Sequence, residues 1–265
     1  MTAAAAYYEH AEQAVGVGVL RLNRPDNRNS MTLELLDAFV AAIAEAKADA
    51  NARCIVITGK GRCFSAGADL TANLQKDGDR PLQPHERSYA MYEPFLSVLD
   101  IEVPVIAALN GHTVGGGLGL ALVCDIRLGS RDAKYGANFA RLGLHPGMAI
   151  SYILPRVVGV SRAAEMLFSG QLVLGAEAEK IGLLSRALDA DEVLKEAMKL
   201  ATRIASNAPI AVRMTKRTFY EGLGWEVRDA AMKEAFAQAV TVDTQDAKEG
   251  VRALLEKRDP TFSGS

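Results

Sequence analysis

Two segments rich in glycine and other small residues are the parts of this sequence best suited to chemistry. The first, residues 63–70, reads Cys-Phe-Ser-Ala-Gly-Ala-Asp-Leu and follows a β-branched run and a turn at residues 59–61. Because a chain without bulky side chains lets the backbone approach a ligand closely, this segment is a candidate binding loop. A simple tight turn would have the same composition, and these residues alone leave both interpretations open.

The second segment, residues 110–120, reads Asn-Gly-His-Thr-Val-Gly-Gly-Gly-Leu-Gly-Leu and lies between a strand pattern and a helix pattern. It is not the dinucleotide-binding fingerprint GxGxxG, because Leu120 occupies the position of the last glycine, and no Gly-Lys-Ser/Thr follows as in a P-loop. What remains is a glycine turn whose N–H groups lie at a positive helix N-terminus. Such amides suit an anion, or the negative charge that develops on a carbonyl oxygen during a reaction.

Alternating strand and helix patterns in the first half would position these segments. Apolar residues at helical spacing predict an amphipathic helix over residues 32–48. The expected strands cover residues 15–21, 55–58, 105–109 and 126–128. Strand–helix alternation implies a mixed or parallel sheet with right-handed crossovers. Each glycine segment then follows a strand of that sheet.

The second half changes character and predicts one helix after another. These helices are expected at residues 162–168, 176–181, 192–205, 210–220, 227–240 and 246–257. A sheet core followed by a helical last third indicates an α+β layout with an α/β-type core, whose helices pack on the core or on a neighbouring subunit. Residues 77–86 hold two prolines and several charges without a pattern, which indicates a mobile loop.

The composition excludes several classes of protein. The chain has 265 residues, of which 49% are hydrophobic and 23% charged, as in ordinary globular proteins. Its 30 Lys and Arg against 32 Asp and Glu give a net charge of −2, without the basic excess of a nucleic-acid-binding protein. Residues 103–124 carry no charge, but Pro104, Asn110 and five glycines interrupt them, so they predict no membrane segment. With three cysteines, no CxxC pair and no basic leader, we expect a reduced, cytoplasmic protein.

Together and in this order, the two segments resemble the crotonase family, the enoyl-CoA hydratase/isomerase superfamily. Further motifs of that family occur in register along nearly the whole chain: Leu-Asn-Arg-Pro at 22–25, Cys-Asp-Ile at 124–126 and Leu-Pro-Arg at 154–156. The resemblance implies a spiral of ββα units. Residues 1–200 would form the core with an acyl-CoA site, and residues 201–265 a helical region for packing and oligomerisation.

That helical tail is expected to assemble the protein. Its apolar positions Val227, Ala231, Phe236 and Val240 would form a stripe buried against another subunit. The resemblance implies a homotrimer or homohexamer. It implies no nucleic-acid or membrane partner, so the partner expected besides the protein's own copies is an acyl-CoA molecule.

The resemblance also implies an oxyanion hole for a thioester carbonyl, formed by the backbone N–H groups of Ala68 and Gly116. Coenzyme A would enter as part of the acyl-CoA substrate, with no tightly bound cofactor and no metal ion. The residues expected at the coenzyme A channel and the hole are Arg28, Ala66, Ala68, Asp69, Leu70 and Gly116.

Two positions depart from the family pattern. A hydratase of this family has two glutamates that handle the water, and here Gly119 and Phe139 occupy their places. Phe139 makes the acyl pocket apolar and favours an aromatic or branched acyl group. A related branch, 4-chlorobenzoyl-CoA dehalogenase, also has glycine at the first position. Its nucleophilic aspartate and its histidine align with Gly147 and Tyr92, so aryl dehalogenation is not supported.

His145 and Tyr92 are the candidates to replace the missing carboxylates. His145 lies in the loop that borders the acyl pocket in this family, where an imidazole could move protons near neutral pH. The alternative is a histidine bonded to a local carbonyl. Tyr92 could also be no more than packing on an apolar helix face. Asp125 is expected to be structural.

Two functions are compatible with this pattern. The first is an acyl-CoA-transforming enzyme, a lyase or isomerase, that stabilises a thioester enolate at Ala68 and Gly116 and handles protons with non-standard residues. The second is a non-catalytic acyl-CoA-binding homologue that keeps the hole and has lost the chemistry. The missing glutamates favour the binder, and the otherwise complete oxyanion apparatus favours the enzyme.

Overall fold

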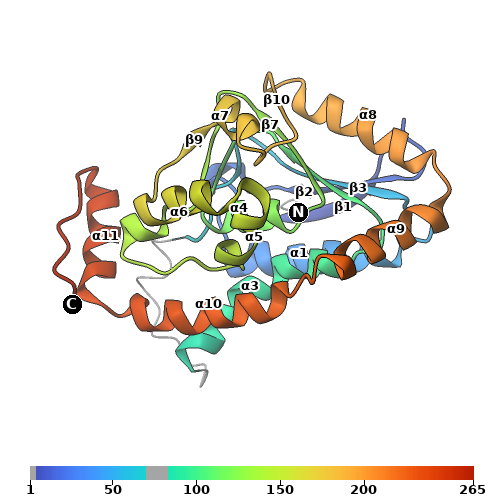
Figure 1. The fold of residues 1–265 in the computed structure, drawn as a ribbon. Coiled ribbons are helices and arrows are strands. Elements are labelled where there is room, and N and C mark those ends of the chain that lie inside the picture. Colours follow the sequence, from blue (N-terminus) through green and yellow to red (C-terminus); the bar gives the residue numbers. More distant parts are fainter. Residues whose placement is uncertain (1–3, 70–82) are drawn as a thin grey trace.

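A six-stranded sheet and a four-stranded sheet form the centre of the molecule (Figure 1). The computed structural model describes residues 4–69 and 83–265. The larger sheet has the order β1 (Ala6–His10), β2 (Val17–Leu22), β3 (Cys54–Gly59), β5 (Val105–Leu109), β7 (Ile126–Ser130), β10 (Arg186–Leu188). Its pairs are parallel except β1–β2. The smaller sheet has the order β4 (Cys63–Ser65), β6 (His112–Val114), β8 (Lys134–Gly136), β9 (Val173–Leu174).

The strands alternate between the two sheets along the chain. β3, β5 and β7 belong to the larger sheet, and the strand after each of them, β4, β6 and β8, belongs to the smaller one. Helix α3 (Pro84–Leu96) follows β4 in the chain, α4 (Gly116–Leu122) follows β6, and α5 (Ile150–Val158) comes after β8. This repetition confirms the predicted spiral of ββα units and the mixed, largely parallel core.

Helices cover both faces of the larger sheet. Because side chains alternate along a strand, Val56 of β3 faces α8 (Val193–Ala205), while Ile55 and Ile57 face the opposite core. That opposite core includes α1 (Leu33–Ala48), whose first turn is capped by the side chain of Thr32 accepting from the amide of Leu35. Strands buried on both faces explain why β3 and β5 read as continuous apolar runs.

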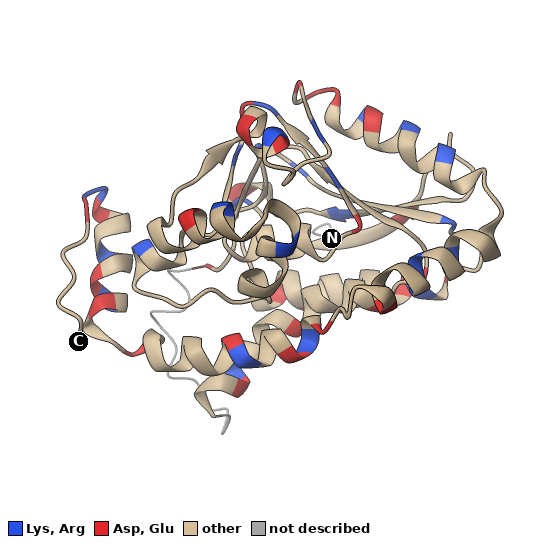
Figure 2. Ribbon diagram, in the orientation of Figure 1, with Lys and Arg blue, Asp and Glu red and all other residues tan. Residues whose placement is uncertain are grey.

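The predicted helices of the second half are all present. They are α6 (Val160–Ser169), α7 (Gly175–Lys180), α8, α9 (Pro209–Gly222), α10 (Val227–Val242) and α11 (Gln245–Glu256). None of the described helices is long and apolar enough to cross a membrane. Acidic and basic residues are mixed along α10 and α11, whereas α8 and α9 each carry three basic residues and one acidic residue (Figure 2).

The prediction of a loop over residues 77–86 is wrong at its C-terminal end, where helix α3 begins. Residues 77–82 lie outside the described part of the chain, but Pro84 begins α3, and Gln83 and Glu86 form a capping box there. His85, assigned to the loop, is therefore helical, and its ring stacks on Phe236 of α10 at 4.0 Å between centroids. Proline at the first helical position was a start signal within this polar segment.

The apolar stripe expected on the tail helix is divided between two environments. Val227 and Ala231 of α10 are buried within the chain, where α10 packs on α3 and α5, whereas Phe236 is 52% and Val240 76% exposed. The division between core and helical region at residue 200 stays a prediction. It falls inside α8, which packs on the sheet as far as Ala205.

Candidate active site

Pairing of β4 with β6 brings the two glycine-rich segments together. The parallel register sets Cys63 opposite His112 and Ser65 opposite Thr113, so the residues after each strand run on side by side. The approach is closest at Gly67, which has a φ of 83°. A Cβ there would lie 2.8 Å from the carbonyl oxygen of Val114 and 2.9 Å from the amide nitrogen of Gly116. Only glycine fits this position.

Two backbone amides at this meeting point have no acceptor. Gly116 is the first residue of α4, and Gly115 before it is the N-cap residue, with a φ of 57°. Among the described residues, the N–H groups of Ala68 and Gly116 make no hydrogen bond, whereas Gly115 donates to Gly136. Free amides at a helix N-terminus carry partial positive charge, so they are suited to a negatively charged oxygen.

A buried asparagine organises the first segment. Asn29 is fully buried, and its amide nitrogen donates to the carbonyl oxygens of Cys63 (2.9 Å) and Phe64 (3.1 Å). Its own carbonyl accepts from Oγ of Ser65, which in turn accepts from the amide of Gly67. Sequence reasoning missed Asn29. Its signal was an asparagine in a polar turn, since this residue tolerates the left-handed backbone, here with a φ of 53°.

Met31 lies beside both glycine-rich segments. Its amide donates to the carbonyl of Gly67 at 2.8 Å, and it forms an isolated parallel bridge with Ala68. A Cβ on Gly116 would collide with Sδ of Met31, at the end of a flexible side chain, while one on Gly117 would collide with the backbone oxygen of Ser65. The stricter glycine requirement is therefore at Gly117, next to the residue that carries the amide.

Apolar side chains lie at or beside positions 119 and 139, where the resemblance predicts that hydratases carry carboxylates. Gly119 lies one turn after Gly116 in α4, and a Cβ there would collide with Cβ of Met148. Phe139, in the 3-10 helix η3 (Asn138–Leu142), lies with Cζ 3.9 Å from where a Cβ of Gly115 would be. The aromatic ring therefore borders the glycine turn, as expected, and Met148 is a further wall residue that the sequence did not reveal.

Tyr92 lies on α3 against the same loop. It is 5% exposed, its hydroxyl donates to Oε1 of Gln238, and that hydroxyl is so close to Gly147 that a Cβ there would collide with it. The structure thus brings together the two positions that align with the dehalogenase pair. Burial and the nearby charge of Glu234 raise the pKa of Tyr92, against a hydrogen bond from Ser88, so the phenol stays protonated.

His145 is held by its neighbours. Nδ1 of its ring is 2.6 Å from the carbonyl oxygen of Pro146, its amide donates to Oγ1 of Thr241 at 3.0 Å, and its carbonyl accepts from Nε2 of Gln238 at 3.0 Å. The ring lines a cavity of about 310 Å³ between α5 and α10. This is the alternative considered from the sequence, a histidine bonded to a local carbonyl.

Three of the residues expected along a coenzyme A channel, Arg28, Ala66 and Asp69, lie in or next to the two segments that carry Asn29 and Ala68. The carbonyl of Arg28 accepts from the amide of Ala66 at 3.1 Å, which ties the polar turn to the segment that carries Ala68. The side chain of Arg28 is exposed, and its backbone has a φ of 60°. Asp69 is partly buried, and Leu70 lies outside the described residues.

Comparison with known proteins shows the family to which the chain belongs. The sequence profile of the enoyl-CoA hydratase/isomerase family matches residues 12–265. The chain belongs to this family. It is 35% identical to a crotonyl-CoA hydratase of Syntrophomonas wolfei over 254 residues, covering 95% of this chain and 96% of the relative.

Solved structures of the enoyl-CoA hydratase/isomerase family share the fold. One from Pseudoalteromonas atlantica superposes with a TM-score of 0.84 at 29% identity, covering 98% of this chain and all of that one. An enoyl-CoA hydratase from Bacillus anthracis gives a TM-score of 0.77 at 31% identity, with the same coverage of both chains. These likenesses extend over the whole fold rather than over one motif.

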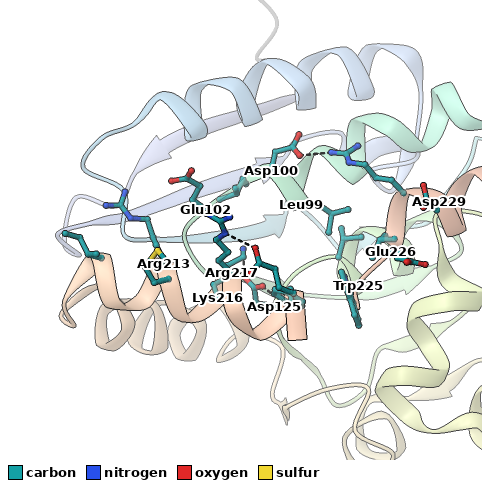
Figure 3. Close-up of a pocket in the computed structure, with 18 residues that line it drawn as sticks. Leu99, Asp100, Glu102, Asp125, Arg213, Lys216, Arg217, Trp225, Glu226 and Asp229 are labelled. Atoms are coloured by element: carbon teal, nitrogen blue, oxygen red, sulfur yellow. Dashed lines mark hydrogen bonds and ion pairs between the residues drawn. The ribbon is translucent and has the colours of Figure 1, made fainter. Parts of the chain in front are cut away.

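A cavity of about 690 Å³, shown in Figure 3, is lined by neither Ala68 nor Gly116. Its lining includes residues 99–102 and side chains of α9. At its edge Asp125 accepts from the amide of Val105, from Nζ of Lys216 at 2.8 Å and from the hydroxyl of Tyr220 at 2.7 Å. Asp125 therefore fastens α9 to the core, as its structural interpretation required. No cluster of His, Cys, Asp or Glu within the described residues has the arrangement of a metal site.

Proposed function

We propose that this chain binds acyl-CoA thioesters and stabilises a thioester enolate with the N–H groups of Ala68 and Gly116. The observation that carries the proposal is the pair of unbonded amides that β4–β6 pairing and Gly67 set beside each other. Fixed donors of this kind cost no reorganisation when charge develops on the oxygen. Coenzyme A would enter with the substrate past Arg28, Ala66, Asp69 and Leu70, without a tightly bound cofactor.

Proton handling falls to Tyr92 rather than to His145 in this proposal. The buried, protonated phenol of Tyr92 can donate a hydrogen bond or a proton at the loop turn of Gly147. The imidazole of His145 is tied to the carbonyl of Pro146 and lines the cavity beside α10. A neutral donor supports reprotonation of the enolate: the O–H bond of Tyr92 breaks, a C–H bond forms at the α-carbon, and solvent returns the proton to the phenolate. Because the protonated phenol takes up no proton, the base that removes the α-proton in the forward step would be solvent hydroxide.

The reaction class that fits these walls is proton transfer at the α-carbon, as in an isomerase or lyase, rather than hydration. Phe139 and Met148 would exclude water from the places where hydratases hold it, and would favour an aromatic or branched acyl group. The rival function is a non-catalytic acyl-CoA binder. It is favoured by the same observation that Met148 fills the space beside Gly119.

The test separates these functions with two readouts on one protein. Exchange of the α-protons of isobutyryl-CoA and phenylacetyl-CoA in D2O, followed by NMR, reports enolate formation. A red shift of a dialkylaminocinnamoyl-CoA on binding reports polarisation of the thioester carbonyl. Exchange together with the shift supports the enzyme, and the shift without exchange supports the binder. Neither signal, with an intact fold by circular dichroism, would overturn the site.

Oligomerisation through the C-terminal helices is part of the proposal. Ile210 and Met214 of α9 and Leu223 after it are 51–70% exposed, and Phe236 and Val240 on α10 are 52% and 76% exposed. Apolar side chains exposed in this number favour burial against a second copy. We expect a homotrimer or homohexamer, and light scattering that shows a stable monomer at micromolar concentration would contradict it.

A further inference from the structure

One face of α10 carries three polar residues that all bind the same loop. Glu234, Gln238 and Thr241 are spaced i, i+4 and i+7, so they share one side of the helix. Each contacts the segment of residues 145–151 that joins η3 to α5. Nε2 of Gln238 donates to the carbonyl of His145, and Oγ1 of Thr241 accepts from the amide of His145, both at 3.0 Å.

Glu234 is the most buried of the three. It is 3% exposed, and its Oε1 accepts from the amide of Ser151 at 2.7 Å and from the hydroxyl of the same residue. The carboxyl group therefore lies at the N-terminus of α5, where the orphan amides of a helix favour negative charge. Its Oε2 is buried and has no hydrogen-bond partner among the described residues.

The segment that these residues hold has a strained backbone. Met148 and Ala149 both have left-handed conformations, with φ of 67° and 56°. Non-glycine residues in this region cost about 1 kcal/mol or more each and persist only where the surroundings hold them. The bonds from α10 supply that restraint on both sides of the strained pair, at His145 and at Ser151.

The strained turn places Met148 and Gly147 beside the proposed acyl site. Met148 packs against Gly119, one turn below the amide of Gly116, and Gly147 lies against the hydroxyl of Tyr92. Gln238 also accepts the hydrogen bond of that hydroxyl, so the same glutamine holds Tyr92 and the loop. The position of α10 is thereby coupled to the wall that an acyl group would contact.

We propose that Glu234, Gln238 and Thr241 are positioning residues that select the acyl group, because they hold residues 145–151, and with them Met148 and Tyr92, against the oxyanion helix α4. This inference rests on the proposed acyl-CoA function. None of the three residues contacts the oxyanion amides. Their expected effect is on the shape of the acyl wall rather than on binding of the coenzyme A portion.

The charge of Glu234 makes this selection depend on pH. Burial raises the pKa of Glu234 to about 7, although the hydroxyl and amide of Ser151 and the amides of Ala149 and Ile150 lower it. The ionised carboxylate binds those donors more strongly than the neutral acid does. Tyr92 faces it from α3, and the titratable or charged residues that line its cavity are His145, Arg156, Glu226, Asp229 and Lys233.

The experiment uses two variants and one matched control in the full chain. Glu234→Gln keeps an acceptor for Ser151 without the charge, and Gln238→Met removes both bonds of Gln238 at similar length. Glu226→Gln is the control, because it removes an exposed carboxylate at the start of the same helix and along the same cavity. Calorimetry gives the affinities of free coenzyme A, acetyl-CoA, isobutyryl-CoA and phenylacetyl-CoA at pH 6 and pH 8. Amide exchange followed by mass spectrometry reports the loop.

In both variants we expect faster exchange in residues 145–151 and at least a tenfold change in the affinity ratio of large to small acyl-CoA. Free coenzyme A should bind as before. In the wild type that ratio should differ between pH 6 and pH 8, and in Glu234→Gln it should not. The control should reproduce the wild type throughout.

Three results would count against the inference in distinguishable ways. A wild type that binds no acyl-CoA overturns the proposed function itself. If the wild type binds acyl-CoA and both variants leave the acyl ratio unchanged while the loop exchanges faster, the loop does not shape the acyl wall. Equal losses for free coenzyme A and every thioester would show a general structural role and would also overturn the positioning role.

Discussion

The two sides of the candidate site are held by different kinds of interaction. On the oxyanion side, Ala68 and Gly116 are fixed by strand pairing, by the close approach of Gly67 and by the fully buried Asn29. On the acyl side, the strained turn at Met148 and Ala149 is fixed by side chains that reach across from α10. The first side is built from backbone within the sheets, and the second depends on the docking of one C-terminal helix.

This difference indicates which properties can vary independently. Oxyanion stabilisation should resist substitutions in the C-terminal helices, because α10 makes no backbone hydrogen bond to Ala68 or Gly116 among the described residues. Acyl selection, in contrast, should respond to them. If the proposed function holds, oxyanion stabilisation can persist without carboxylates at positions 119 and 139, because the two sides of the candidate site are held separately.

The largest expected effect tests whether the acyl side still supports water chemistry. General acid–base groups contribute about 10²–10⁴-fold each, and both positions are apolar here, at Gly119 and Phe139. We expect hydration of crotonyl-CoA to be at least about 10⁴-fold slower than in a family member with both glutamates. The measurement is loss of enoyl-thioester absorbance at equal protein concentration. Hydration at the rate of such an enzyme would contradict this prediction, because other groups on the acyl side would then have to hold and activate the water.

The next prediction tests the N–H donor of Gly116 by comparing two substitutions at that position. Gly116→Pro removes the amide proton at the first helical position, where proline is well tolerated, and Gly116→Ala keeps the proton. Both variants carry a Cβ that meets Met31, so the alanine variant measures that contact, and the proline variant in addition replaces the amide proton by Cδ of its ring. We expect the proline variant to lose about 10²–10³-fold more α-proton exchange than the alanine variant. Equal rates in two folded variants would mean that the thioester oxygen does not bind at Gly116.

The glycine segments and the strands before them could be predicted from the sequence, because their composition is a local signal. The pairing of β4 with β6 and the burial of Asn29, which bring the segments together, could not. The strand predicted at residues 105–109 is present as β5, Val105–Leu109, and the predicted glycine turn is present before α4. The acyl side could not be predicted in the same way. Glu234 and Gln238 read as exposed polar positions on a helix, and their burial depends on contacts with residues 83 and 93 positions away in the chain.

A smaller effect tests whether the acyl side carries a buried charge. The folded pKa of Glu234 is about 7, above the unfolded value near 4.3, so the folded protein binds this proton more tightly. The stabilisation is complete below the unfolded pKa and is lost as the pH rises through 7. Between pH 5 and pH 8 the wild type should lose on the order of 2 kcal/mol of unfolding free energy relative to Glu234→Gln. Urea unfolding at several pH values measures this difference, and parallel pH profiles of the two proteins would show that Glu234 does not titrate in this range.

The smallest effect is expected at His145, the most obvious proton-transfer residue in the sequence. Its amide and its carbonyl, rather than its ring, connect it to Thr241 and Gln238, and its Nδ1 is engaged by the carbonyl of Pro146. Replacing the ring by the amide of glutamine leaves both backbone contacts in place. We therefore expect His145→Gln to change α-proton exchange by less than about tenfold, below the contribution of a general acid–base group. Tyr92→Phe is the comparison, because it removes a hydroxyl bonded to Gln238 and should cost more. A loss of hundredfold or more in His145→Gln, with normal amide exchange in residues 145–151, would move proton transfer from Tyr92 to the imidazole.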